Sequence, residues 1–242
     1  MSGIYFHIPF CKQACHYCNF HFSTSLQQKD ELVAAMVNEI NITEWYDDKI
    51  ETIYFGGGTP SLLNEEELKK LLDAAHRKYN VSKDAEITLE ANPDDIDKNK
   101  LLSWKQAGIN RLSVGIQSFK NEDLLWMNRA HNAEQALNCI YKIKDAGFNN
   151  FSVDLIYGTP TLTDIDWQKN LATVIDLNVP HLSCYALTVE PKTALQKMIA
   201  LNKIEDVDTE NKIDSTEEKK EGPHVTFRPV KVARLAQQQR SF

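Results

Sequence analysis

The chain has 242 residues, of which 42% are hydrophobic and 25% are charged, and its formal net charge is -7. These values are typical of a globular protein with one sizeable core, and an α/β barrel can use this length as a single domain. A mildly acidic chain without a basic stripe is a poor binder of nucleic acid and of anionic lipid surfaces, because both need clustered Lys and Arg.

Residues 1–9 do not have the pattern of a targeting signal. They lack a basic region, and His7 and Pro9 interrupt their apolar run. The sequence also contains no run of about 20 apolar residues, which a transmembrane helix would need. We therefore expect a cytoplasmic protein that does not span a membrane.

Strand and helix patterns alternate along the chain. The strand patterns cover residues 3–8, 52–55, 86–91, 112–117, 151–157 and 181–187. The helical patterns cover residues 29–45, a stretch that opens at residue 64, and residues 97–107, 132–146 and 164–177. Asn64 and Glu67 form a plausible capping pair, and Gly108 and Gly147 each end a helix. This alternation predicts βαβ units and a parallel sheet.

Three of the five cysteines lie within eight residues, just after the first strand pattern, at Cys11, Cys15 and Cys18. An odd, clustered set indicates a metal centre in a reducing compartment and not a disulfide framework. Three thiolates on one short loop can hold three irons of a cubane cluster, and the fourth iron can then chelate the amino and carboxylate groups of a small molecule.

A zinc site of three cysteines and one histidine is the alternative for this loop. The histidine would be one of three near the cysteines, namely His7, His16 or His21. The other two cysteines, Cys139 and Cys184, lie on helix and strand patterns and are predicted to be small core residues.

Polar and glycine-rich signals follow the later strands. The run Gly56-Gly57-Gly58-Thr59-Pro60 could be an ordinary turn, but its glycines would also let the backbone approach a ligand closely. Four polar residues, Glu90, Gln117, Arg129 and Asp154, lie at or beyond the carboxyl ends of later strands or within them, and barrel active sites are built at that end.

Each of these polar residues also has a purely structural interpretation. Asp154 interrupts an apolar strand, which is costly without a partner, so Asp154 or Glu90 could form an ion pair with Arg111. Gln117 could cap a helix. The positions of these residues on the strands are compatible both with these structural roles and with ligand binding.

Together the motifs resemble the radical S-adenosylmethionine superfamily. The matching segments are residues 5–11, 15–18, 56–60, 115–119, 128–129 and 154–158. They look like the branch that contains the oxygen-independent coproporphyrinogen III oxidases of porphyrin biosynthesis and the related haem chaperones. The resemblance covers residues 3–204 and implies an α/β fold, a partial (β/α)6 barrel with parallel strands.

The resemblance also implies the cofactors and their ligands. A 4Fe-4S cluster would be bound by Cys11, Cys15 and Cys18, and it would bind S-adenosyl-L-methionine and cleave it reductively into methionine and a 5′-deoxyadenosyl radical. The implied S-adenosylmethionine contacts are Tyr5, Tyr17, Gly57, Gly58, Thr59, Glu90, Gln117, Arg129 and Asp154.

Two features separate the members of this branch. Phe20 lies two places after Cys18, where the oxidases have a further cysteine and the chaperones have phenylalanine, and only ten residues precede Cys11, fewer than in the oxidases. The resemblance therefore favours a chaperone that binds haem as cargo and delivers it to haem-requiring proteins. The alternatives are oxidative decarboxylation of coproporphyrinogen III to protoporphyrinogen IX and another radical reaction. The candidate haem ligands are His7, His16, His21 and His131.

The resemblance divides the chain into two parts. Residues 1–204 would form the core barrel. Residues 205–242 are polar, with a mixed charge run and a glutamine run, and we expect them to be disordered or unrelated to the family, whose members continue into a further C-terminal domain.

Overall fold

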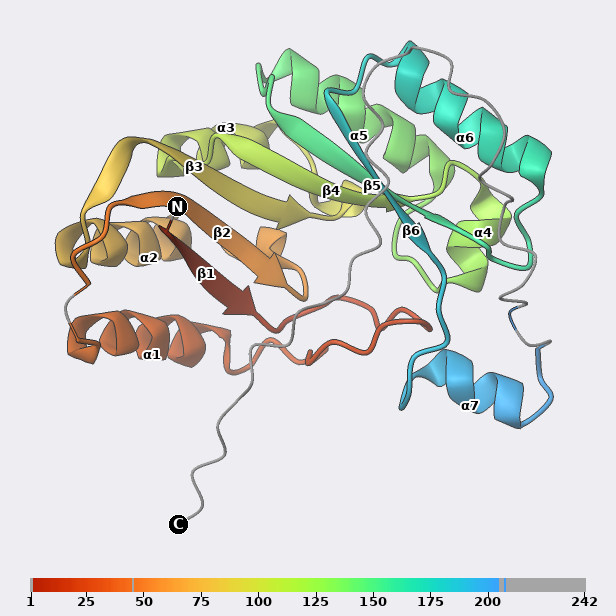
Figure 1. Cartoon of the computed structure of the whole chain (residues 1–242), viewed down its shortest axis with the longest axis horizontal. Helices are drawn as coiled ribbons and strands as arrows, with labels where there is room; N and C mark the ends of the chain where they lie inside the picture. The colour runs from red at the N-terminus through yellow and green to blue at the C-terminus, as the bar shows by residue number, and fades with distance from the viewer. Residues whose placement is uncertain (1, 45, 205–206, 208–242) are drawn as a thin grey trace.

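Six strands form one all-parallel sheet, and their order in space is their order in the chain. The computed structural model describes residues 2–44, 46–204 and 207. The strands are β1 (Ser2–Ile8), β2 (Ile50–Gly57), β3 (Val81–Ala91), β4 (Arg111–Gln117), β5 (Phe151–Tyr157) and β6 (His181–Ala186). Because β1 and β6 are the two edges, the sheet is an open, partial barrel (Figure 1). This confirms the predicted fold class.

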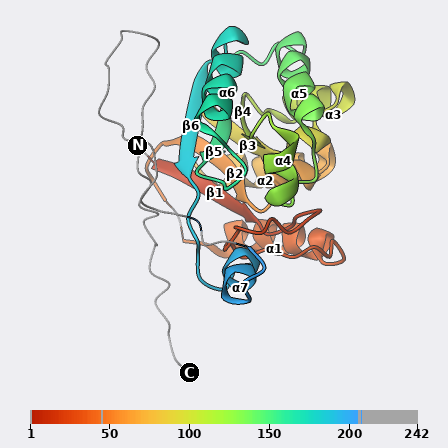
Figure 2. The ribbon, with the colours of Figure 1, turned by 90° about the vertical axis from the view of Figure 1, so that its right-hand side faces the viewer.

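Helices connect successive strands and lie on one face of the sheet. They are α1 (Lys29–Ile42), α2 (Glu65–Lys78), α3 (Lys98–Ala107), α4 (Asn121–Trp126), α5 (Ala133–Asp145), α6 (Asp164–Asp176) and α7 (Ala194–Ala200), with 3₁₀ turns η1 (Pro60–Leu62) and η2 (Pro93–Asp95). Figure 2 shows α2, α3, α5 and α6 on the same side of the strands. The helix α7 lies beyond the strand ends, near the loop that follows β1 (Figure 1).

The predicted helix boundaries hold at most positions and need one correction. Asn64 and Glu67 form a capping box on α2, and α3 ends at Gly108, whose φ is 105°. The helix expected over residues 29–45 ends at Ile42, because Thr43 is extended (φ -61°, ψ 144°) and its hydroxyl donates to the carbonyl oxygen of Glu39 over 2.6 Å. Trp45 lies outside the described residues.

Alternation along the strands gives the sheet two different faces. In β4, Leu112, Val114 and Ile116 are fully buried, as expected for side chains that face the helices. The residues between them (Arg111, Ser113, Gly115 and Gln117) are polar or lack a side chain. Parallel sheets are usually apolar on both faces, so this polar face is unusual and is a candidate binding surface.

The core lies between the sheet and the helices. Ile53, Phe55 and Leu89 from the strands are completely buried with Leu68 and Trp104 from α2 and α3. Cys139 is buried in this core as predicted, and Cys184 packs against it. None of the described helices has the length and apolar content needed to cross a membrane. The predicted tail, residues 205–242, lies outside the described residues apart from Val207.

Candidate functional site

The loop that carries the three cysteines leaves β1 and is closed at its base. The N–H of Cys11 donates to the carbonyl oxygen of Ser23 over 3.0 Å, and the N–H of Ser23 donates to that of Pro9 over 2.7 Å. Within the loop, the N–H of Cys18 donates to the carbonyl oxygen of Cys15 over 3.3 Å. All three cysteines are free thiols and are partly exposed. The loop therefore presents three thiols from one short, hydrogen-bonded segment.

The donor set of this loop fits an iron–sulfur cluster. Each cysteine of a cubane cluster binds its own iron, so the three sulfurs need not converge on one point. Among the described residues, no three His, Cys, Asp or Glu side chains converge on a point suited to a single metal ion. Burial raises the pKa of Cys11 and of Cys18, and neighbouring sulfurs add to both increases. Because metal ligation requires thiolates, cluster binding would release protons from these thiols.

Two of the three histidines of the zinc alternative each use one ring nitrogen on a backbone carbonyl oxygen. The ring Nδ1 of His16 donates to the carbonyl oxygen of Trp126 over 2.8 Å. The ring Nε2 of His7 lies 3.4 Å from the carbonyl oxygen of His21.

The glycine turn after β2 packs directly against the cysteine loop. A Cβ on Gly58 would lie 2.7 Å from the carbonyl oxygen of Phe10 and 3.0 Å from Sγ of Cys11. Only glycine fits so close to another backbone. Thr59 is buried and hydrogen-bonds with Cys11, which lowers the pKa of that thiol and partly offsets the effect of its burial. The turn and the loop therefore form one surface.

Glu90 lies on the open face of β3 and contacts the same turn. Its Oε2 accepts the N–H of Gly57 over 3.2 Å, and its Oε1 accepts the hydroxyl of Tyr54 over 2.8 Å. Burial, together with the nearby Asp154, raises the pKa of Glu90 to about 7. The sheet thus holds a carboxyl group that can be protonated near neutral pH beside the glycine turn.

Asp154 lies on the open face of β5, and no described residue forms a close ion pair with it. Burial raises its pKa to about 6, while hydrogen bonds from Ser183 and Ser113 and the nearby Arg111 oppose the rise. Arg111 forms its own ion pair with Glu86, at 3.7 Å. Asp154 is therefore held by hydroxyl groups, and the predicted alternative of an Arg111 pair with Asp154 or Glu90 is not what the structure shows.

Arg129 joins the cysteine loop to the sheet. Its Nη1 donates to Sγ of Cys15 over 3.3 Å and to the hydroxyl of Tyr17 over 3.4 Å. Its Nη2 donates to Oδ1 of Asn92 over 2.7 Å and to the carbonyl oxygen of Gly115 over 2.8 Å. Within the described residues, its buried Nε has no hydrogen-bond partner. An unpartnered donor on a buried cation fits a site that takes an anionic ligand group.

Two further predicted contacts are Gln117, in β4, and Tyr5, in β1. Gln117 ends β4 with a φ of 68°, and a Cβ on Gly115 would lie 2.9 Å from its Nε2 and 3.3 Å from Nη2 of Arg129. Gln117 does not cap α4, whose N-cap is Lys120. Tyr5 stacks on Tyr54 at a centroid distance of 5.9 Å and is 57% exposed.

The structure brings some of the predicted residues together, in three contacting groups that do not include Tyr5, Gln117, Asp154 or Cys18. Thr59 and Gly58 contact Cys11, Arg129 contacts Cys15 and Tyr17, and Glu90 contacts Gly57. Sequence reasoning missed Tyr54, Asn92 and Ser183. Asn92 could have been found, because it lies two residues after Glu90 and so shares its side of the strand.

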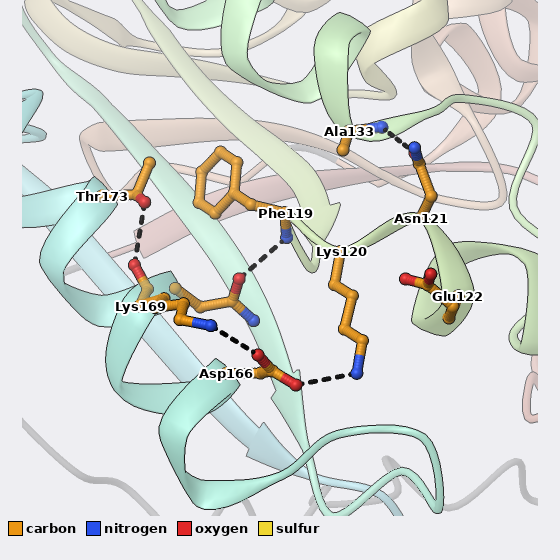
Figure 3. Close-up of a pocket in the computed structure, with 9 residues that line it drawn as sticks. Phe119, Lys120, Asn121, Glu122, Ala133, Asp166, Lys169 and Thr173 are labelled. Atoms are coloured by element: carbon orange, nitrogen blue, oxygen red, sulfur yellow. Dashed lines mark hydrogen bonds and ion pairs between the residues drawn. The ribbon is translucent and has the colours of Figure 1, made fainter.

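A separate hollow lies between α4, α5 and α6 (Figure 3). Lys120 and Lys169 line it, and both donate to Asp166, over 2.8 and 3.1 Å. Its lining also includes Asn170, whose Oδ1 accepts the N–H of Phe119 over 3.0 Å. The lining residues include none of the predicted site residues, and their bonds connect neighbouring helices and loops.

The fold and the cysteine loop define a radical SAM protein. The sequence profile of the radical SAM superfamily matches residues 5–174, and the chain belongs to that superfamily. This family is characterised by a 4Fe-4S cluster and S-adenosylmethionine. Within it, the similarities to HemW and HemN given below place the chain in the branch that contains these two proteins.

The chain is similar to two curated proteins named heme chaperone HemW. It is 38% identical to HemW of Bacillus subtilis over 203 residues, which is 82% of this chain and 54% of the relative. It is 37% identical to HemW of Escherichia coli over 195 residues, or 79% of this chain and 52% of the relative. The chain thus spans about half the length of these relatives.

Solved structures share the fold. Coproporphyrinogen III oxidase (HemN) from Escherichia coli superposes with a TM-score of 0.71 at 28% identity, covering 83% of this chain and 52% of that protein. The radical S-adenosylmethionine methyltransferase TsrM from Kitasatospora setae superposes with a TM-score of 0.60 at 15% identity, covering 84% of this chain and 39% of that protein. At 15% identity the second comparison shows the fold alone.

Proposed function

We propose that Cys11, Cys15 and Cys18 hold a 4Fe-4S cluster and that one iron remains free to bind S-adenosylmethionine. When bound, the cluster supplies the electron that cleaves the cofactor's sulfonium. The hydrogen bond from Arg129 to Cys15 carries this proposal, because it puts the cysteine loop and the polar face of the sheet into one site. The protein's own task is to bind and orient the cofactor and to exclude water from it.

The polar face supplies the cofactor contacts in this proposal. The backbone at Gly57 and Gly58 binds the methionine amino group, and the buried fork of Arg129 binds the carboxylate, for which a planar guanidinium is well suited. Glu90, Gln117 and Asp154 bind the ribose and the adenine. The remaining contacts are Tyr5, Tyr17 and Thr59.

We further propose that the protein serves as a haem chaperone, with haem as cargo for delivery to haem-requiring proteins. The similarity to HemW from two bacteria supports this role. Phe20 also supports it, because the related oxidases have a cysteine at this position. Its side chain is 58% exposed beside the cysteine loop, where a large apolar ligand could cover it.

Coproporphyrinogen III oxidation is the second candidate. The similarity in structure to HemN of Escherichia coli favours it. The sequence identity to that protein is 28%, against 38% for HemW of Bacillus subtilis, and Phe20 departs from the oxidase pattern. We therefore place the chaperone first.

The four candidate haem ligands differ in their burial and hydrogen bonding. His131 is 4% exposed, its Nε2 donates to the carbonyl oxygen of Ile116 over 2.9 Å, and burial lowers its pKa to about 4. His7 and His16 each use one ring nitrogen on a backbone carbonyl. His21 is exposed, and we propose it as the first ligand to test, since an accessible imidazole is a common haem ligand.

Two anaerobic assays on the 242-residue chain test the chaperone role. In the first, haem is titrated and its transfer to an apo-cytochrome is followed. In the second, coproporphyrinogen III is incubated with S-adenosylmethionine and a reductant. We expect stable haem binding and transfer without protoporphyrinogen. Turnover in the second assay without haem binding in the first would make the protein an oxidase.

Histidine variants of the same chain test the ligand. His21→Ala should weaken haem binding and shift its absorption, whereas His76→Ala, which removes an exposed histidine on α2, should leave both unchanged. Equal effects of the two substitutions would rule out His21 as the ligand.

A further inference from the structure

The segment Trp126-Met127-Asn128, just before Arg129, lies against the cysteine loop. The side-chain Nδ2 of Asn128 donates to the carbonyl oxygen of Ala14 over 2.7 Å. In return, Nε2 of Gln13 donates to Oδ1 of Asn128 over 2.8 Å and to its carbonyl oxygen over 3.0 Å. Gln13 and Ala14 lie between the first two cysteines of the motif, so the bonds hold that interval at two of its three residues.

The same segment holds the interval between the second and third cysteines. The N–H of His16 donates to the carbonyl oxygen of Met127 over 3.1 Å, and its ring Nδ1 donates to that of Trp126 over 2.8 Å. The carbonyl oxygen of His16 accepts the N–H of Leu195, in α7, over 2.8 Å. Both intervals of the cysteine motif are thus bonded to one three-residue segment.

The backbone at Asn128 is left-handed, with a φ of 57°. The residue ends α4 in a Schellman arrangement, in which the N–H of Arg129 donates to the carbonyl oxygen of Leu124 over 2.8 Å and that of Asn128 to Leu125 over 3.0 Å. Asparagine tolerates this conformation, and glycine tolerates it better. The backbone turn alone therefore does not require an asparagine, whereas the two side-chain bonds to Gln13 and Ala14 do.

We propose that Asn128 is a positioning residue for the cluster ligands, whose side chain holds the loop from Cys11 to Cys15 in its binding shape before metal arrives. The proposal rests on the assignment of Cys11 and Cys15 as ligands. The proposal adds that the turn at Asn128, which also places Arg129, sets the spacing of the thiols. Cluster binding and cofactor binding would then both depend on this turn.

Asn128→Gly separates the two roles of this residue, because it keeps the left-handed turn and removes the side-chain bonds. Gln13→Ala removes the two bonds that Gln13 donates, one to Oδ1 and one to the carbonyl oxygen of Asn128. Because Gln13 is exposed, this substitution cannot create a buried cavity. Asn178→Gly is the matched control. Asn178 has a φ of 47° in the same Schellman arrangement at the end of α6, and its Nδ2 donates to the carbonyl oxygen of Asp176.

Two readouts are needed on the full chain. In the metal-free protein, the alkylation rate of each cysteine is measured by mass spectrometry, with buried Cys139 as the internal reference. In the reconstituted protein, the rate of cluster loss to a chelator is measured. Asn128→Gly and Gln13→Ala should each raise both rates roughly tenfold, the size expected for one or two lost hydrogen bonds. Asn178→Gly should leave both at the wild-type value.

A double variant, Gln13→Ala with Asn128→Gly, should raise both rates by less than the product of the two single effects, because the bond from Gln13 to Oδ1 of Asn128 is lost in each single variant. Wild-type rates in Asn128→Gly, or equal acceleration in Asn178→Gly, would overturn the proposal. If the wild-type chain took up no cluster, the ligand assignment would fail instead, and the alkylation rates would still decide whether Asn128 holds the loop.

Discussion

Nη1 of Arg129 donates a hydrogen bond to Sγ of Cys15 over 3.3 Å, although the two residues are 114 positions apart in the chain. The other terminal nitrogen of the same guanidinium bonds to Asn92 and to the carbonyl oxygen of Gly115. One side chain thus connects the proposed cluster loop with β4 and with the residue that follows β3.

Arg129→Ala should weaken S-adenosylmethionine binding. Losing a charge-assisted contact to a carboxylate costs about 1.5–3 kcal/mol, or roughly 10- to 100-fold in affinity. This affinity is measured by calorimetry on reconstituted wild-type and variant proteins with the same iron content. Arg77→Ala, which removes an exposed arginine of α2, is the control. Wild-type affinity in Arg129→Ala would mean that the side chain only supports the fold.

Gly58→Ala should prevent cluster binding, because its new Cβ would lie 2.7 Å from the backbone oxygen of Phe10 and would displace the cysteine loop. Gly108→Ala is the control. It imposes a strained φ of 105° at a cost of about 1–2 kcal/mol, but its Cβ has only Leu72 nearby, at 3.8 Å. Iron content after anaerobic reconstitution should fall in the first variant alone. Full iron content in Gly58→Ala would disprove the close packing of turn and loop.

Glu90 should make the metal-free protein less stable as the pH rises. Its pKa is raised to about 7 in the folded chain, so the folded state binds more protons than the unfolded state between the ordinary glutamate pKa and pH 7. Stability is then highest at low pH and is lost as the pH rises through 7. The melting temperature of the wild-type protein, measured relative to that of Glu90→Gln, should therefore fall between pH 5 and pH 8. The corresponding loss in the free energy of unfolding is about 1–3 kcal/mol. A difference that does not change with pH would contradict the burial of an ionisable carboxyl group here.

Much of the fold was predictable from the sequence, because the strands alternate with helices that carry clear end signals. The capping pair of Asn64 and Glu67 and the glycine at residue 108 mark helix ends through local hydrogen bonds and backbone freedom alone. The end of α1 was not predictable in this way, because apolar periodicity continues past Ile42 while the extended backbone of Thr43 ends the helix.

The site was predictable only as a set of residues. The cysteine spacing and the strand-end positions named the candidates, but the contacts between them join segments far apart in the chain. Asn92 supports Arg129, and its place two residues after Glu90 indicates its side of the strand but not its contact with Arg129. Asn128 was quoted only as part of a motif, and its role depends on a left-handed turn and on contacts with Gln13 and Ala14 that only three-dimensional packing reveals.

The most direct test of the account is metal analysis after anaerobic reconstitution of the wild-type chain and its cysteine variants. We predict about four irons per chain, the content of one 4Fe-4S cluster, and their loss in Cys11→Ala, Cys15→Ala and Cys18→Ala. Cys184→Ala, which changes a cysteine outside the loop, should keep the full iron content. Stoichiometric zinc without iron uptake in the wild-type chain, or a full cluster in any of the three loop variants, would contradict the assignment.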